Sequence, residues 1–156
     1  MRRFLSVIGA LALAGLVACG LGVAVLAHQG SQLDTESKAF VDEALPSIAA
    51  HWEESQLLDR ATPELRASLK PGQLQGLFAS LAKFGPLVVY EGSKGTSTMS
   101  YFAGSGTTIT ASYVAKAQFQ NGAAAFKIIL LKRDGQWRIH NFHVDRIPGN
   151  RSAQGV

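Results

Sequence analysis

Cysteine is nearly absent from this sequence of 156 residues, with a single copy at position 19. One cysteine excludes a disulfide framework, and it also excludes a zinc site built from several cysteines. An excess of charge is missing as well. Of the 15 Lys and Arg residues, Arg2 and Arg3 precede an apolar run, which leaves 13 against 11 Asp and Glu in residues 28–156. So balanced a composition does not favour nucleic-acid binding. No known active-site motif is present, and the residues after the apolar run suffice for one domain with one core.

The apolar run covers residues 4–27 and directly follows the two N-terminal arginines. It is longer than the roughly 7 to 15 residues of a signal peptide's apolar region, and it reaches the roughly 20 that cross a bilayer as a helix. The basic residues before it predict that the N-terminus stays in the cytoplasm. We therefore expect an inner-membrane anchor with a periplasmic domain, if the source is a bacterium.

Two processing events at this segment remain open. Val25 and Ala27 satisfy the small-residue rule for cleavage before His28, which would release a periplasmic or secreted protein. Residues 16–19, Leu-Val-Ala-Cys, resemble a bacterial lipoprotein box in which Cys19 would be the lipidated residue. The apolar stretch after Cys19 differs from the polar tether with which mature lipoproteins usually begin.

The remaining chain changes its hydrophobic period once. Residues 28–34 are predicted to be a spacer, residues 35–84 have a helical pattern, residues 87–146 alternate like strands, and residues 148–156 are predicted to be a flexible tail. Apolar residues four apart, from Phe40 to Trp52, predict one helix kinked at Pro46, and Thr62-Pro63 and Pro71 predict the starts of two more. The fold class is α+β: helices first, then a curved four-stranded antiparallel meander, over residues 35–147.

Two dipeptides, Asn121-Gly122 and Asp134-Gly135, predict tight hairpins and so fix which residues face each other. Around the first turn, this pairs Phe119 with Ala124, Ala117 with Phe126, Ala115 with Ile128 and Tyr113 with Leu130. Around the second, Leu130 pairs with Ile139. The match then fails unless one extra residue, a bulge near His140 and Asn141, brings Phe142 opposite Ile128 and Val144 opposite Phe126.

The helices-then-meander order, with the segment Asp134-Gly135-Gln136-Trp137-Arg138-Ile139 in its last hairpin, resembles the nuclear transport factor 2-like superfamily. The likeness covers about residues 35–146 and is greatest to small exported bacterial members without an assigned function. It implies a cone of helices wrapped by the inner face of the sheet, frequent pairing of subunits through the outer face, and functions from isomerases to binding modules. Fold alone does not choose among these functions.

Enzymes of that superfamily use a carboxylate or histidine base inside the cone. The side chains predicted to face inward include no Asp, Glu or His, so a base would have to come from outside them: His51, Glu53, Glu54, Asp59 or Glu91. We therefore favour a protein without catalytic residues. A small binding pocket is the remaining option, lined by Tyr113, Lys132, Trp137 and Trp52. Plain core packing, with Lys132 extending over Trp137, is the favoured alternative.

The outward face of the predicted sheet mixes apolar and basic side chains, with Val114 expected opposite Ile129 and Ser112 opposite Leu131. A clustered apolar patch with a polar rim is typical of a partner surface. We expect an interface there, with the chain itself as the first candidate partner, because twofold pairing is the commonest assembly. Its predicted residues are Val114, Ile129, Leu131, Arg138, His140 and His143.

His140 and His143, with Asp145, are a candidate set of metal ligands, but no supporting second shell can be identified and no metal is predicted. No cofactor is expected either. The sequence thus favours an exported, membrane-associated binding or assembly module, with the membrane contacted through residues 4–27 and no nucleic acid bound. A small-molecule-binding cone with possible acid–base chemistry and a component of an envelope-spanning complex, with another envelope protein as partner, are the alternatives.

Overall fold

A computed structural model describes residues 30–70, 72–102 and 106–147, and the chain divides into two compact units, residues 1–33 and 34–156. The predicted anchor, the lipidation at Cys19 and the C-terminal tail lie outside the described residues. Among the residues that are described, no helix is long and apolar enough to cross a membrane. The account below concerns the described residues, nearly all of which belong to the second unit.

The helical half begins earlier than the sequence indicates. Residues 30–51 form one helix, here the long helix, so most of the predicted spacer is helical and the helix continues through Pro46. Within this helix, the Asp34 carboxylate accepts hydrogen bonds from the backbone N–H and hydroxyl of Ser97, both at 2.6 Å. Asp34 therefore ties the helix to the sheet.

Three short α-helices and a 3-10 turn follow: α2 (Glu54–Leu58), α3 (Pro63–Ser68), α4 (Gln73–Leu81) and η1 (Ala82–Phe84). The predicted start of α3 is confirmed, since the Thr62 hydroxyl accepts a hydrogen bond from Leu65 N–H at 3.2 Å and Pro63 is the first helical residue. Trp52 ends the long helix in the left-handed region, with φ 52°. Its ring packs against those of Phe78, Phe119 and Phe126, which joins α4 to the sheet.

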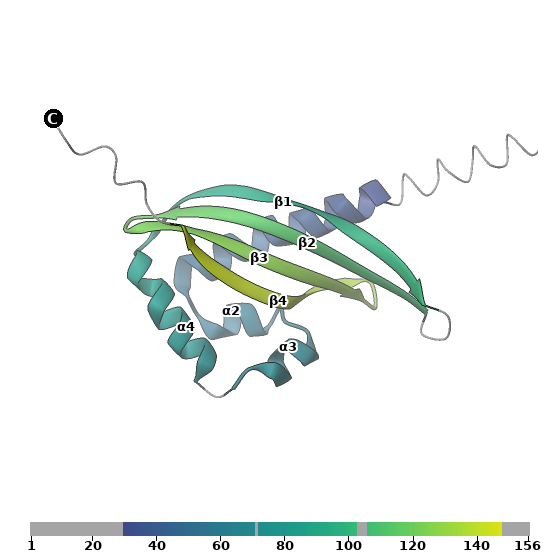
Figure 1. The fold of residues 1–156 in the computed structure, drawn as a ribbon, viewed down its shortest axis with the longest axis horizontal. Coiled ribbons are helices and arrows are strands. Elements are labelled where there is room, and N and C mark those ends of the chain that lie inside the picture. The colour runs from purple at the N-terminus through teal and green to yellow at the C-terminus, as the bar shows by residue number, and fades with distance from the viewer. Residues whose placement is uncertain (1–29, 71, 103–105, 148–156) are drawn as a thin grey trace, which may run out of the picture. The chain divides into compact units, whose positions relative to one another are not determined.

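The strands β1 (Leu87–Phe102), β2 (Gly106–Phe119), β3 (Gly122–Arg133) and β4 (Gln136–Ile147) form one antiparallel sheet in the order β1-β2-β3-β4. The predicted α+β meander is therefore confirmed. Figure 1 shows the strands arching over the helices, which lie on one side of the sheet. The core lies between these layers, with Phe126, Leu130, Ile139, Leu45 and Ile48 at 1% exposure or less.

The second hairpin follows the predicted register. Lys132 pairs with Trp137 and Leu130 with Ile139 across Asp134 and Gly135, which both have positive φ. The sheet shifts register after that, and Ile128 pairs with Phe142 and Phe126 with Val144. The predicted bulge is confirmed, and His140 is its extra residue.

The first hairpin was predicted two residues out of register. It reverses at Gln120 and Asn121, so that Ala117 pairs with Ala124 rather than with Phe126. The turn is held by the end of the helical half: Asn121 N–H donates to the Phe84 carbonyl at 2.8 Å, and Gln120 N–H donates to the Pro86 carbonyl at 3.0 Å. These tertiary contacts override the local preference of Asn-Gly for the turn centre.

The error leaves the faces of the sheet unchanged, because a shift of two residues keeps every side chain on its side. From Ala111 to Phe119 and from Ala124 to Leu130, alternate residues are buried, as the sequence predicts. The division into an inner and an outer face is therefore confirmed.

Candidate functional site

The four residues of the predicted pocket do not come together. Tyr113 is buried at 2% exposure, and its hydroxyl lies 2.9 Å from the Ser37 hydroxyl and donates to the Asp34 carbonyl at 3.1 Å. Trp52 packs in the aromatic cluster with α4. Lys132 lies over the Trp137 ring, 5.4 Å from its centre, and forms an ion pair with Glu36. The expected packing of Lys132 over Trp137 is thus observed.

An open groove of about 590 Å³ lies beside Trp137, between the long helix, the end of α2 and the start of β4. Of the four predicted pocket residues, only Trp137 lines this groove. Its remaining walls are Glu36, Ala39, Phe40, Glu43, Asp59, Arg60, Gln136 and Arg138. Both acidic and basic side chains line it, which gives no single charge preference for a ligand.

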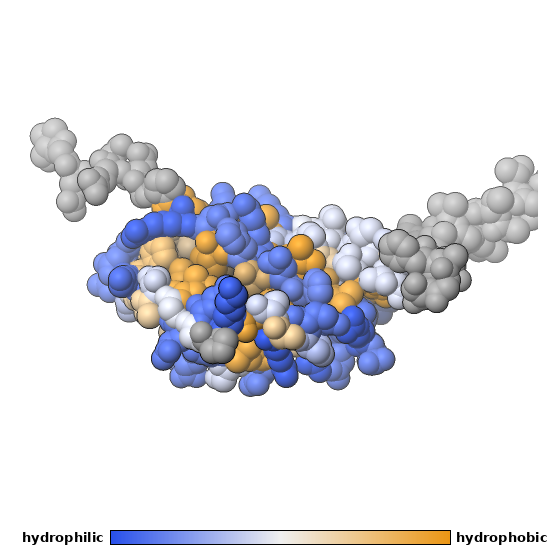
Figure 2. All heavy atoms as spheres, turned by 60° about the horizontal axis from the view of Figure 1, so that its bottom comes forward, coloured by the Kyte–Doolittle hydropathy of each residue, from blue (hydrophilic) through white to orange (hydrophobic). Residues whose placement is uncertain are grey.

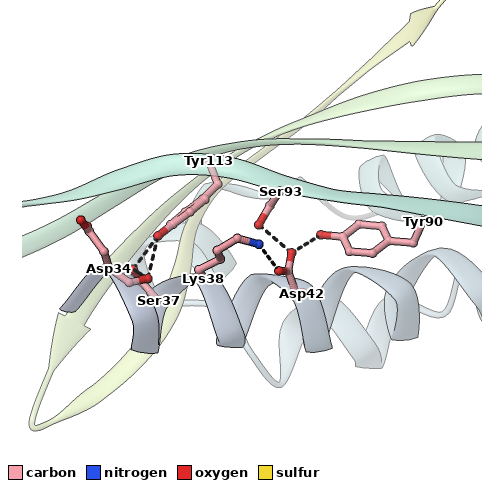
Figure 3. A network of polar contacts seen from close by, with 7 residues as sticks. All are labelled: Asp34, Ser37, Lys38, Asp42, Tyr90, Ser93 and Tyr113. Atoms are coloured by element: carbon pink, nitrogen blue, oxygen red, sulfur yellow. Dashed lines mark hydrogen bonds and ion pairs between the residues drawn. The ribbon is translucent and has the colours of Figure 1, made fainter. Parts of the chain in front are cut away.

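A polar network joins the long helix to β1 and β2, and sequence reasoning missed it (Figure 3). Its centre is the Asp42 carboxylate, which accepts hydrogen bonds from the Tyr90 hydroxyl at 2.7 Å and the Ser93 hydroxyl at 2.6 Å. Lys38, one turn earlier, forms an ion pair with the same carboxylate. Asp42 therefore ties the edge strand β1 to the helix.

The electrostatics of this network favour the ionised carboxylates. Burial by itself raises the pKa of Asp42, but the bonds from Lys38, Ser93 and Tyr90 outweigh it and hold the pKa below its ordinary value. The Ser97 hydroxyl and backbone N–H likewise lower the pKa of Asp34. Burial, and then the bond to Asp42, raise the pKa of Tyr90. The two carboxylates are consequently engaged acceptors rather than free bases.

The candidate bases named from the sequence are placed on the surface. His51, Glu53, Glu54, Asp59 and Glu91 are all exposed, and Glu91 accepts a hydrogen bond from Gln118 at 2.7 Å. A general base gains strength from a dry pocket, which an exposed group lacks. None of the five occupies the inner face of the sheet.

The outer face of the sheet carries the predicted interface residues in a corrected arrangement. Val114 pairs with Lys127, and Ser112 with Ile129, so Val114 and Ile129 are diagonal neighbours rather than a facing pair. They remain exposed, at 44% and 38%, and both line a hollow of about 480 Å³. Lys94, Lys127 and His143 lie at the same hollow.

Leu131 was predicted to be part of this exposed patch, but it is only 9% exposed. The chain between α2 and α3 runs along the edge of β4, where Ala61 pairs with Ile139 in parallel. Together with Leu131, this segment lines a second hollow, and Leu131 forms part of its floor. Arg138, which pairs with Leu131, lines the second hollow as well.

The histidines of β4 have different partners. His143 Nε2 lies 2.9 Å from Asp145 Oδ1, whereas His140, the bulged residue, faces the Thr62 hydroxyl at 3.3 Å. Lys127 also contacts Asp145, at 2.7 Å, and the hydrogen bonds from Lys127 and His143 lower the pKa of that carboxyl. Within the part of the chain that the structure describes, no group of three His, Cys, Asp or Glu side chains could hold a metal ion.

Comparisons of the chain with protein-family models, with curated proteins and with solved structures found no match.

Proposed function

We propose that this protein is a non-catalytic binding or assembly module that pairs with a second copy through the outer face of its sheet. The observation that carries the proposal is the outer-face hollow, in which Val114 and Ile129 are exposed side by side within a rim of Lys94, Lys127 and His143. An exposed apolar patch with a polar rim is typical of protein contact surfaces.

The charges on this face support a second copy as the occupant. Asp145 and Arg138 both belong to β4 and lie at opposite ends of the Val114–Ile129 patch along the strand. A twofold axis that crosses the strands between the Lys127 and Ile129 rows would place Asp145 of each copy opposite Arg138 of the other. One surface would thus supply both partners of each ion pair, as isologous pairing requires.

The proposal includes the export of the domain. Residues 4–27 have the length and flanking charges of a membrane anchor, and the helices-first cone resembles the nuclear transport factor 2-like superfamily, whose members often pair through this face. Anchoring both copies in the same membrane would assist pairing, because tethering raises the effective concentration of the second copy.

Replacement of Ile129 by Asp tests the pairing. A carboxylate would replace an apolar side chain at the centre of the interface, and its desolvation opposes pairing, so the purified variant is expected to be monomeric where the native chain is expected to be dimeric. The mass can be measured by light scattering of the detergent-solubilised chain, with the detergent contribution subtracted.

The matched control is Leu77→Asp. Leu77 is as exposed as Ile129, at 36%, but it belongs to α4 in the helical layer, where apolar surface also reaches the exterior (Figure 2). This variant is expected to remain a dimer. A native chain that is already monomeric, or an Ile129→Asp chain of unchanged mass, would contradict the proposal.

A further inference from the structure

A second hollow, next to the pairing patch, lies at the Asp134–Gly135 end of the sheet. Its volume is about 310 Å³, within reach of the smallest ligand pockets. Three arginines from three different elements line it: Arg66 from α3, Arg133 from the end of β3 and Arg138 from β4. Of the described residues that line it, only Asp134 is acidic.

Two residues in the lining of this hollow are buried and held by hydrogen bonds to the sheet. Ala61 and Thr62 are buried at 0% and 1% exposure. They are held to the edge of β4, because Thr62 N–H donates to the Ile139 carbonyl and Ile139 N–H donates to the Arg60 carbonyl, both at 2.8 Å. The three arginines themselves belong to α3, β3 and β4 rather than to loops, which reduces the entropy that a ligand must overcome.

Each guanidinium retains donors for a ligand. Arg133 donates to Glu64 at 2.6 Å, and Arg138 donates to Gln136 at 3.1 Å, each through one terminal nitrogen of a group with five N–H donors. Among the described residues, the Arg66 guanidinium has no hydrogen bond or ion pair. Glu64, which is not in the lining, offsets the charge of Arg133. The net charge of the hollow stays positive, because Arg66 and Arg138 outnumber Asp134.

We propose that this hollow binds a phosphate group. Guanidinium groups match the oxygens of phosphate in paired hydrogen bonds, and three arginines against Asp134 and the neighbouring Glu64 leave a net positive charge, which favours an anion such as a phosphate monoester. The ligand is either a soluble phosphate ester or the headgroup of a phospholipid, since both present the same chemistry.

Calorimetric titration of the full-length detergent-solubilised chain with inorganic phosphate, in chloride buffer at neutral pH, tests this site. Saturable binding is expected, and Arg66→Gln should weaken it about tenfold, because it removes a charge-assisted donor pair. Lys83→Gln is the control: it removes one exposed positive charge from η1, at the opposite end of β3, and should leave the affinity unchanged. No saturable heat, or equal affinity in the Arg66→Gln chain, would overturn the proposal.

Two further titrations identify the source of the phosphate. Tighter binding of short-chain phosphatidic acid than of glycerol 3-phosphate would support a lipid headgroup, and the reverse would support a soluble ester. The two proposals share Arg138, which pairing would place opposite Asp145 of the second copy. The Ile129→Asp chain keeps all three arginines of the hollow, so it should still bind phosphate, and a failure of either proposal can be recognised separately.

Discussion

Gly95→Ala is expected to destabilise the domain more than any other change considered for this chain. Gly95 of β1 lies opposite Tyr113 of β2, and a Cβ at position 95 would stand 1.9 Å from the Ser112 carbonyl oxygen and 2.8 Å from Tyr113 Cα. These are backbone atoms of the neighbouring strand, so no side chain can rotate to make room. The two strands would have to separate, at a cost of at least about 3 kcal/mol in the free energy of unfolding, the upper end for overpacking.

The loss can be measured by urea unfolding followed by tryptophan fluorescence, because Trp137 is buried in the core and Trp52 packs in the aromatic cluster. Gly76→Ala is the control. Gly76 lies within α4 with open space around it, and alanine there should stabilise the helix by about 1 kcal/mol. The two variants are expected to change the free energy of unfolding in opposite directions. A Gly95→Ala chain as stable as the native one would mean that β1 and β2 do not approach so closely.

Asp42→Ala is expected to have the second largest effect. It leaves the buried Ser93 hydroxyl and the half-buried Tyr90 hydroxyl without their acceptor, so we expect a loss of about 2–3 kcal/mol in the free energy of unfolding. The same urea titration measures it. Asp59→Ala removes an exposed carboxylate without a side-chain hydrogen bond among the described residues, and it should change stability by less than about 0.5 kcal/mol.

The contribution of Asp42 depends on pH in a defined direction. Its pKa is lower in the folded chain than in the unfolded chain, so its stabilisation is complete above the unfolded value, near 4, and is lost as the pH falls through the folded value. The native chain should therefore lose stability in acid more steeply than the Asp42→Ala chain. Parallel acid profiles for the two chains would show that Asp42 is not bound as described.

The sequence was sufficient for the faces of the sheet and for the second hairpin. Alternation over Ala111 to Phe119 requires one buried face, and Asp134-Gly135 can form its turn without help from distant residues. The first hairpin could not be predicted in the same way, because contacts with Phe84 and Pro86, which lie more than thirty residues earlier, decide where the turn falls.

Features that involve β1 could not be predicted, because the sequence of this strand carries the weakest signal. Residues 87–102 are rich in Ser, Thr and Gly and lack a sustained apolar alternation, so their register against β2 could not be derived. The Asp42 network and the requirement for Gly95 both follow from that register. The burial of Leu131 was missed for a related reason, since the short bridge between Ala61 and Ile139 has no local sequence signal.

The most direct test of pairing through the outer face is cross-linking of full-length chains in their own membranes. With Cys19 replaced by Ser, a single cysteine in place of Ile129 lies next to the proposed twofold axis, and a cysteine in place of Leu77 lies in the helical layer. A short bismaleimide should join two Ile129→Cys chains into a covalent dimer and leave Leu77→Cys chains single. Absence of the Ile129→Cys dimer, or equal cross-linking at both positions, would contradict self-pairing through this face.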